Sequence, residues 1–172
     1  MAQKYTPFEV VITAIITKDG KYLVTRRSLT KKRFPGLWTV PGGHLDPSDF
    51  IGMPKETADY WYNILEKALR REVKEEVGVE IENIEYVTSL ATIHEDDLSG
   101  NAVSPSLVIS CLADYVSGDV KLQEEETDKF DWVTLEQAKN MPLIDGIYDE
   151  LVMAEEKRKN RQGKNKKEWK RS

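Results

Sequence analysis

The sequence predicts a single domain of the α/β (α+β) class, and three observations lead to this prediction. Two runs of β-branched and aliphatic residues flank an Asp-Gly turn near the N-terminus, a pattern typical of a β-hairpin. Apolar residues then recur at helical spacing between residues 63 and 77. The chain has 172 residues, enough to bury one sizeable core, and we find no internal repeat and no second domain.

Strands are expected in the hairpin and again in the second half of the chain. The hairpin strands are residues 10–17 and 21–25, and a short strand at 37–40 should stop at Pro41-Gly42-Gly43. Residues 44–62 contain several Pro and Gly residues and should be irregular. Four later runs are also expected to be strands: 79–89, 91–94, 107–115 and 130–133.

Three helices are expected. The first covers residues 63–77, with Asn63 as its N-cap and Gly78 where helices commonly end. A short second helix should follow Thr134, because Thr134 and Gln137 form a capping-box pattern. The third should run from about residue 144 to residue 159.

Charge is distributed unevenly along the chain. The formal net charge is -5, yet residues 155–172 carry nine Lys or Arg and only three Glu. The acidic body of the chain could hold divalent cations. We take residues 1–159 as the domain. Residues 160–172 have little to bury, and we expect a disordered, solvated basic tail. Binding of this tail to an anionic surface or a polynucleotide is the less favoured alternative.

The apolar stretches indicate a cytoplasmic protein that is not held in a membrane. Cys111 is the one cysteine in the sequence and lies in a strand-like run, which fits a buried thiol in a reducing compartment. The apolar run at 10–17 lacks a basic leader and is too short to span a bilayer.

The helix at 63–77 carries the residues with the most specific chemistry. Successive residues on a helix advance by about 100°, so Glu72, Glu75 and Glu76 share one arc beside the apolar stripe. Carboxylates crowded beside a core repel one another and lose solvation, and a hard divalent cation relieves both effects. A solvated acidic face is the alternative interpretation of such a run of Glu.

The surrounding motif favours the metal. Residues 71–79, Arg-Glu-Val-Lys-Glu-Glu-Val-Gly-Val, match the second half of the Nudix box position for position. A chance match should occur on the order of once in ten thousand sequences of this length. Residues 37–43 also resemble the strand and double glycine that precede the box in MutT-like members. The resemblance covers about residues 8–155 and implies the Nudix fold, an α/β/α sandwich with a mixed central β-sheet.

The sequence departs from the family pattern before the helix. The Nudix box normally has a Glu eight residues before its Arg, and that position is Asn63 here. The box Gly is also farther away, because residues 47–60 are an insertion. Glu56 or Glu66 could partly take the place of the missing Glu.

The resemblance implies roles for individual residues. Glu72 and Glu76 would bind Mg²⁺, or Mn²⁺ as a substitute, with help from the Gly42 carbonyl. Glu75 would bind a further ion or orient a water, and Arg71 would orient the neighbouring carboxylates. For the general base the candidates are Glu124, Glu125 and Glu126, of which we select Glu125. Substrate contacts are expected from Arg26, which is favoured over its neighbour, and also from Arg27 and Gly43.

The resemblance also implies an activity. We expect Mg²⁺-dependent hydrolysis of a nucleoside diphosphate linked to another moiety, with a nucleoside triphosphate as first choice, giving nucleoside monophosphate and pyrophosphate. ADP-ribose or a nucleotide sugar is the alternative substrate, and a non-catalytic nucleotide-sensing domain or a diphosphate isomerase are further alternatives. The aromatic residues 60–62 could stack on a base, but packing on a neighbouring helix or contact with a second copy in a homodimer is favoured. Loops 27–36, 44–62 and 95–104 should determine base selection.

Overall fold

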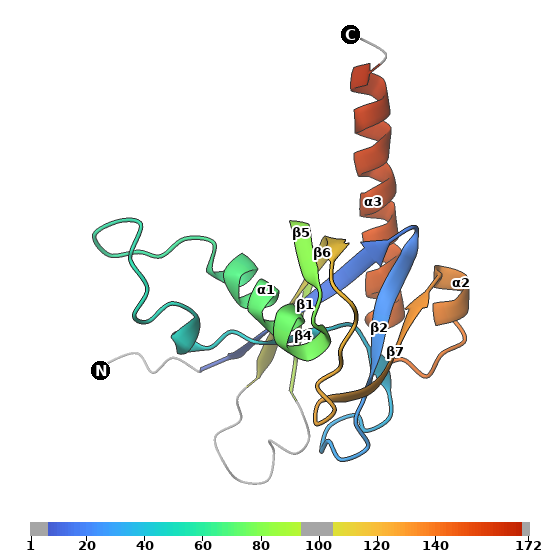
Figure 1. Cartoon of the computed structure of the whole chain (residues 1–172), viewed down its shortest axis with the longest axis horizontal. Helices are drawn as coiled ribbons and strands as arrows, with labels where there is room; N and C mark the ends of the chain where they lie inside the picture. The colour runs from blue at the N-terminus through green and yellow to red at the C-terminus, as the bar shows by residue number, and fades with distance from the viewer. Residues whose placement is uncertain (1–6, 94–104, 170–172) are drawn as a thin grey trace.

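The computed structural model describes residues 7–93 and 105–169, with side chains described as far as Arg161. A mixed sheet lies between helices on both of its faces, as Figure 1 shows. Its strand order is β3-β2-β1-β6-β5, with β4 also paired to β1 and β7 to β2. The predicted α/β/α sandwich with a mixed sheet is therefore confirmed.

Along the described part of the chain, four strands precede the first α-helix, and three further strands precede the last two helices. The strands are β1 (Glu9–Lys18), β2 (Lys21–Arg27), β3 (Trp38–Thr39), β4 (Gly42–His44), β5 (Glu80–Thr92), β6 (Ser106–Ser117) and β7 (Thr127–Val133). The helices are α1 (Ile64–Val77), α2 (Leu135–Ala138) and α3 (Ile147–Trp169), with a 3-10 turn, η1, at Pro47–Asp49.

Strand β1 is the centre of the sheet and separates two hydrophobic cores. It runs parallel to β6 and antiparallel to β2 and β4. Because successive side chains on a strand point to opposite faces, Ala14 and Ile16 pack on the side of α1 whereas Ile15 packs on the side of α3. All three side chains are fully buried, so β1 is covered on both faces.

Helix α1 begins and ends close to where its sequence predicts. Leu69, Val73 and Val77 are fully buried against the sheet, as their spacing requires. Gly78 ends the helix in a left-handed conformation (φ 75°), which glycine adopts without steric cost. Asn63 is the N-cap residue, but it also has a left-handed backbone and its side chain makes no capping hydrogen bond. The predicted N-cap position is therefore correct, but Asn63 occupies it without a capping hydrogen bond from its side chain.

Strand β3 ends at Thr39, just before Pro41-Gly42-Gly43 as predicted, but the double glycine then begins a further strand that the sequence did not predict. Gly42 and Gly43 form strand β4, which pairs with Thr13 and Ile12 of β1. A Cβ atom on Gly42 would lie 2.3 Å from the Ile12 carbonyl oxygen. Glycine thus lets β4 approach β1 more closely than a residue with a side chain would allow.

Two further elements differ from their predicted bounds. The runs at 79–89 and 91–94 form one strand, β5, whose pairing with β6 contains register shifts, while residue 94 lies outside the described residues. Helix α3 extends to Trp169, ten residues beyond the predicted end, and projects from the body in Figure 1. Lys, Arg and Gln are good helix formers, so a docked helix can continue through a segment that buries little.

The predicted capping box at the start of the short helix α2 is confirmed. The Thr134 side chain accepts a hydrogen bond from the Gln137 N–H, and the Gln137 side chain accepts one from the Thr134 N–H. Together with α3, this helix covers the second face of the sheet. No helix among the described residues is long and apolar enough to cross a membrane.

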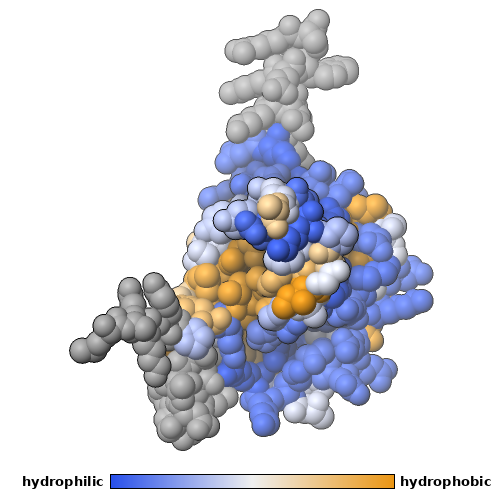
Figure 2. All heavy atoms as spheres, turned by 90° about the vertical axis from the view of Figure 1, so that its left-hand side faces the viewer, coloured by the Kyte–Doolittle hydropathy of each residue, from blue (hydrophilic) through white to orange (hydrophobic). Residues whose placement is uncertain are grey.

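The insertion folds back on itself beside α1. The Phe50 and Trp61 rings lie 5.3 Å apart, and the Trp61 indole N–H donates to the Met53 carbonyl. Tyr60 and Tyr62 remain exposed, as do Ile51 and Met53. Figure 2, viewed from the side on which the insertion projects in Figure 1, shows apolar residues gathered among hydrophilic surface. A role of these aromatic residues in base stacking or dimer contact stays a prediction.

The close approach of β4 to β1 leads to a stability prediction. Replacing Gly42 with Ala should lower the free energy of unfolding by about 1–3 kcal/mol, because the new Cβ meets backbone atoms of β1. Urea denaturation measures the change. The control is Gly43→Ala, whose Cβ would meet only the Glu72 side chain. If Gly42→Ala were as stable as the natural chain, the close packing of β4 would be contradicted.

Candidate active site

Glu76 is the most deeply buried carboxylate of α1. Its residue is only 8% exposed, and one carboxylate oxygen accepts a hydrogen bond of 2.9 Å from the Gly42 N–H. The Thr25 hydroxyl, from β2, donates to the other oxygen over 3.4 Å. Burial raises the pKa of Glu76 to about 7, although the hydrogen bond from Gly42 acts in the opposite direction. A buried carboxylate charge is costly, and a bound cation would stabilise it.

Glu72 lies one helical turn before Glu76 and meets the next residue of β4. A Cβ atom on Gly43 would be 2.2 Å from the carboxylate of Glu72, so only glycine leaves room for this side chain. Burial raises the pKa of Glu72 as well, and its charge also acts on Glu76. Two acidic side chains therefore lie against two consecutive glycines, beneath one short strand.

Arg71 connects the acidic residues around it. Its guanidinium lies 2.9 Å from Glu72 and 3.0 Å from Glu75, and its Nε donates to Asp49 over 2.6 Å. A longer hydrogen bond of 3.4 Å reaches the His44 carbonyl at the end of β4. The hydrogen bond to Asp49, with the nearby carboxylates, raises the pKa of Arg71 further above its usual range. These contacts are those that an orienting role for Arg71 requires.

Glu75 differs from the other two box carboxylates. Its side chain is 56% exposed, and its partner among the described residues is Arg71. Glu75 therefore stands at the solvent-exposed rim of the site.

The loop before β7 brings a fourth carboxylate to the site, and it is not the one selected from the sequence. Glu126 is partly buried, and its negative charge contributes to the raised pKa of Glu76. Its partner is Lys31, at 2.5 Å. Glu124 and Glu125 are exposed. Periodicity could not separate three consecutive Glu residues in a turn, whereas in the structure Glu126 is the one that is partly buried and whose charge acts on Glu76.

The two arginines at the end of β2 are engaged by the protein itself. Arg26 forms a two-point ion pair with Asp128, with distances of 2.7 and 2.6 Å. The Nε of Arg27 donates to the Arg33 carbonyl over 2.9 Å. Substrate binding by Arg26, which the sequence favours, would therefore require the ion pair with Asp128 to open. For both arginines this role stays a prediction.

The donor chemistry of the site fits a divalent cation. Within the described residues, no three His, Cys, Asp or Glu side chains converge into a complete metal cage. Mg²⁺ does not need one, because it is usually held by one or two carboxylates and keeps several waters. Glu72 and Glu76 supply two such carboxylates, both with their charge disfavoured by burial. An added cation would reverse that electrostatic cost.

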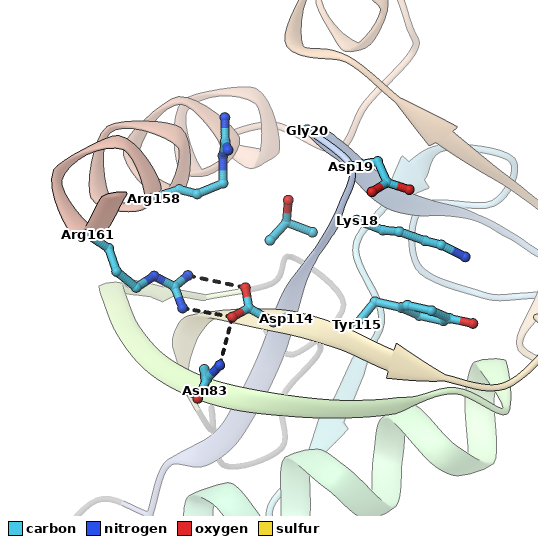
Figure 3. A pocket seen from close by; sticks show the side chains of 9 residues that line it. Lys18, Asp19, Gly20, Asn83, Asp114, Tyr115, Arg158 and Arg161 are labelled. Carbon is cyan, nitrogen blue, oxygen red and sulfur yellow. Dashed lines mark hydrogen bonds and ion pairs between the residues drawn. The ribbon is translucent and has the colours of Figure 1, made fainter. Parts of the chain in front are cut away.

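A pocket of about 580 Å³ lies elsewhere on the molecule and does not contain this chemistry. Figure 3 shows it between α3 and the β1–β2 turn, about five residues along β1 from the residues that pair with β4. Two of its charged groups are paired with each other: Arg161 contacts Asp114 at 2.9 Å, and the Asn83 amide donates to the same carboxylate at 2.9 Å. We therefore place the candidate site at the carboxylates and not in this pocket.

Sequence reasoning missed two residues that the structure brings to the site. Thr25 contacts Glu76 across 51 positions, and nothing in a strand sequence signals such a contact. Asp49 contacts Arg71 from the insertion, where the pattern Asp46-Pro47-Ser48-Asp49 does indicate a cap but does not reveal its partner. The loop at 95–104, expected to help select the base, lies outside the described residues.

Known proteins are similar to this chain in sequence and in fold. NAD-capped RNA hydrolase NUDT12 from Homo sapiens is 33% identical over 129 residues, which are 74% of this chain and 22% of that protein. Nucleoside triphosphatase NudI from Enterobacter is 27% identical over 142 residues, covering 77% of this chain and 86% of NudI. Isopentenyl-diphosphate Delta-isomerase from Klebsiella pneumoniae is 29% identical, covering 79% of this chain and 70% of the isomerase.

The chain spans about a fifth of the length of NUDT12, so that similarity concerns one part of a longer protein. Among solved structures, the MutT protein from Methanosarcina mazei superposes with a TM-score of 0.63 at 24% identity, covering 91% of this chain and 99% of the other. This likeness agrees with the sandwich in Figure 1. The NUDIX domain matches residues 7–153, which include every described strand, helices α1 and α2, and the beginning of α3. The chain therefore belongs to the Nudix family.

Proposed function

We propose that this chain is a Mg²⁺-dependent pyrophosphohydrolase that cleaves the anhydride bond of a nucleoside diphosphate derivative. One observation carries the proposal: the carboxylates of Glu76 and Glu72 lie against the consecutive glycines Gly42 and Gly43 of β4. Burial raises the pKa of both carboxylates and so disfavours their charged forms. Such an arrangement gains most from a divalent cation, and a cation held at carboxylates suits the charge of a diphosphate.

We assign each side chain of the site a separate role in the reaction. A bound cation would neutralise phosphate oxygens and favour the attack of water on phosphorus. Glu72 and Glu76 would hold that cation, while Arg71 keeps Glu72 and Glu75 in place. Glu126, a carboxylate paired with Lys31, is the group we assign to accept the proton of the attacking water. Glu75, at the exposed rim, would orient that water.

A nucleoside triphosphate is the substrate we favour, and hydrolysis would give nucleoside monophosphate and pyrophosphate. The support is the likeness to nucleoside triphosphatase NudI, because the match covers most of both proteins. The likeness to NUDT12 has higher identity but concerns a small part of that protein. The likeness to NUDT12 supports a second candidate substrate, a diphosphate anhydride that joins two nucleotides, as in the NAD cap of an RNA.

A product screen separates these candidates. Nucleoside triphosphates, NADH, ADP-ribose and isopentenyl diphosphate are each incubated with Mg²⁺ and then Mn²⁺, and products are resolved by chromatography. The proposal expects monophosphate and pyrophosphate from at least one triphosphate. Cleavage of NADH or ADP-ribose alone would move the substrate to the second candidate or to the nucleotide-sugar class. Isomerised diphosphate, or binding without any release, would contradict hydrolysis.

Removal of the buried carboxylate should abolish turnover. Glu76→Gln keeps the shape of the side chain and removes the charge that would hold the cation, so we expect kcat to fall at least about a hundredfold. The control is Glu80→Gln, which removes an exposed carboxylate paired with Lys74 just beyond the same helix. Unchanged activity in Glu76→Gln would exclude Glu76 as a ligand of the catalytic cation.

The raised pKa of Glu76 predicts a pH dependence of stability in chelator-treated protein. Between pH 4.5 and about 7 the folded state keeps a proton on Glu76 that the unfolded state has lost. This contribution to stability is complete below pH 4.5 and disappears as the pH rises through 7. The Tm of the natural chain, measured relative to Glu76→Gln in EDTA, should therefore fall across that window. Parallel Tm curves would contradict the burial of an ionisable Glu76.

A further inference from the structure

Arg71 is held most tightly by a residue outside the helix that carries it. Asp49 accepts hydrogen bonds of 2.6 Å from the Nε and 3.2 Å from a terminal nitrogen of Arg71, a two-point contact. The side chain of Asp49 is only 3% exposed, whereas Arg71 remains 35% exposed. Asp49 is thus the buried anchor of this pair, and it comes from the insertion.

The insertion is folded so that Asp49 arrives already oriented. Asp46 caps η1 by accepting from the Ser48 N–H over 2.8 Å, and Pro47 opens the turn. Asp49 in return accepts from the Asp46 N–H over 2.8 Å, which closes a capping box. Because Asp49 is fixed on one side by backbone and on the other by Arg71, its carboxylate has little freedom to move. Its lowered pKa, caused chiefly by Arg71, agrees with a permanently ionised group.

The other acidic or substituted positions cannot do this. Asn63 lies directly before α1, so a residue there is two helical turns, about 12 Å, from Arg71 along the axis. Glu56, also in the insertion, is paired with Lys67 at 2.8 Å. The sequence-based suggestion that Glu56 replaces the missing box Glu is therefore not supported by its contacts.

We propose that Asp49 is the positioning residue of this site, acting through Arg71 on Glu72 and Glu75. The inference rests on the proposed function, since it assigns Asp49 a part in that reaction. In this chain the insertion that interrupts the box would also supply the carboxylate that Asn63 does not provide. An apparent defect of the motif is then compensated by the segment that creates it.

Electrostatics explains why Arg71 needs this anchor. A guanidinium beside Glu72 competes with a cation for the same carboxylate. Asp49 occupies the Nε edge of Arg71, and Glu72 is contacted by a single terminal nitrogen at 2.9 Å. Without Asp49, Arg71 would be free to form a two-point pair with Glu72. Cation affinity and kcat should therefore fall together, with KM for the nucleotide changing less.

The activity test uses an isosteric change. Asp49→Asn should lower kcat about ten- to a hundredfold. The matched control, Glu56→Gln, removes another ion pair of the same insertion and should leave kcat within about twofold of the natural chain. In an Arg71→Ala background, Asp49→Asn should cause no further loss, because its effect passes through Arg71. An equal further loss in that background would overturn the positioning role.

A second measurement needs neither cation nor substrate. In chelator-treated protein, the Arg71 Nε–H should give a slowly exchanging NMR signal that disappears in Asp49→Asn and persists in Glu56→Gln. If the natural chain shows no hydrolysis while this signal behaves as stated, the proposed function fails and the Asp49–Arg71 anchor stands. If hydrolysis is present and the signal and kcat are unchanged in Asp49→Asn, the positioning role is refuted and the proposed function stands.

Discussion

The hydrogen bond between the Gly42 N–H and the Glu76 carboxylate joins the acidic helix to the sheet. Glu76 lies among buried apolar residues of α1, so its carboxylate is buried when the helix packs against the sheet. Burying such a charge is costly unless it is hydrogen-bonded or neutralised. Strand β4 supplies the hydrogen bond, and Gly42 is the residue that allows β4 to lie close enough to β1 to supply it. The fold and the chemistry of the site thus depend on the same contact.

Other features of the site follow from that packing. Once β4 lies over α1, Gly43 leaves space for Glu72, and the end of β4 reaches Arg71 through the His44 carbonyl. The chain then turns into η1, which brings Asp49 to the other side of Arg71. The insertion is long, but its first turn is short and closely tied to the site. Its remainder is held together by the contact between the Phe50 and Trp61 rings.

Local patterns in the sequence predict what depends on local physics. The apolar spacing of Leu69, Val73 and Val77 predicts α1, and the same helical geometry places Glu72 and Glu76 together. Contacts between distant segments leave no such pattern. Periodicity could not show that Gly42 pairs with Thr13, or that Asp49 meets Arg71 across 22 positions. Nor could it choose Glu126 over Glu125, since a turn has no regular spacing and only the packing of the loop on α1 distinguishes them.

The central claim is that Glu76 is a buried carboxylate whose ionised form is stabilised by a bound divalent cation. A ¹³C NMR titration of the Glu76 carboxyl carbon, with and without Mg²⁺, measures this property at the atom concerned. The account predicts a midpoint near pH 7 in EDTA and a much lower midpoint with Mg²⁺. The same midpoint under both conditions would contradict it, because a cation bound at Glu76 must favour the ionised form.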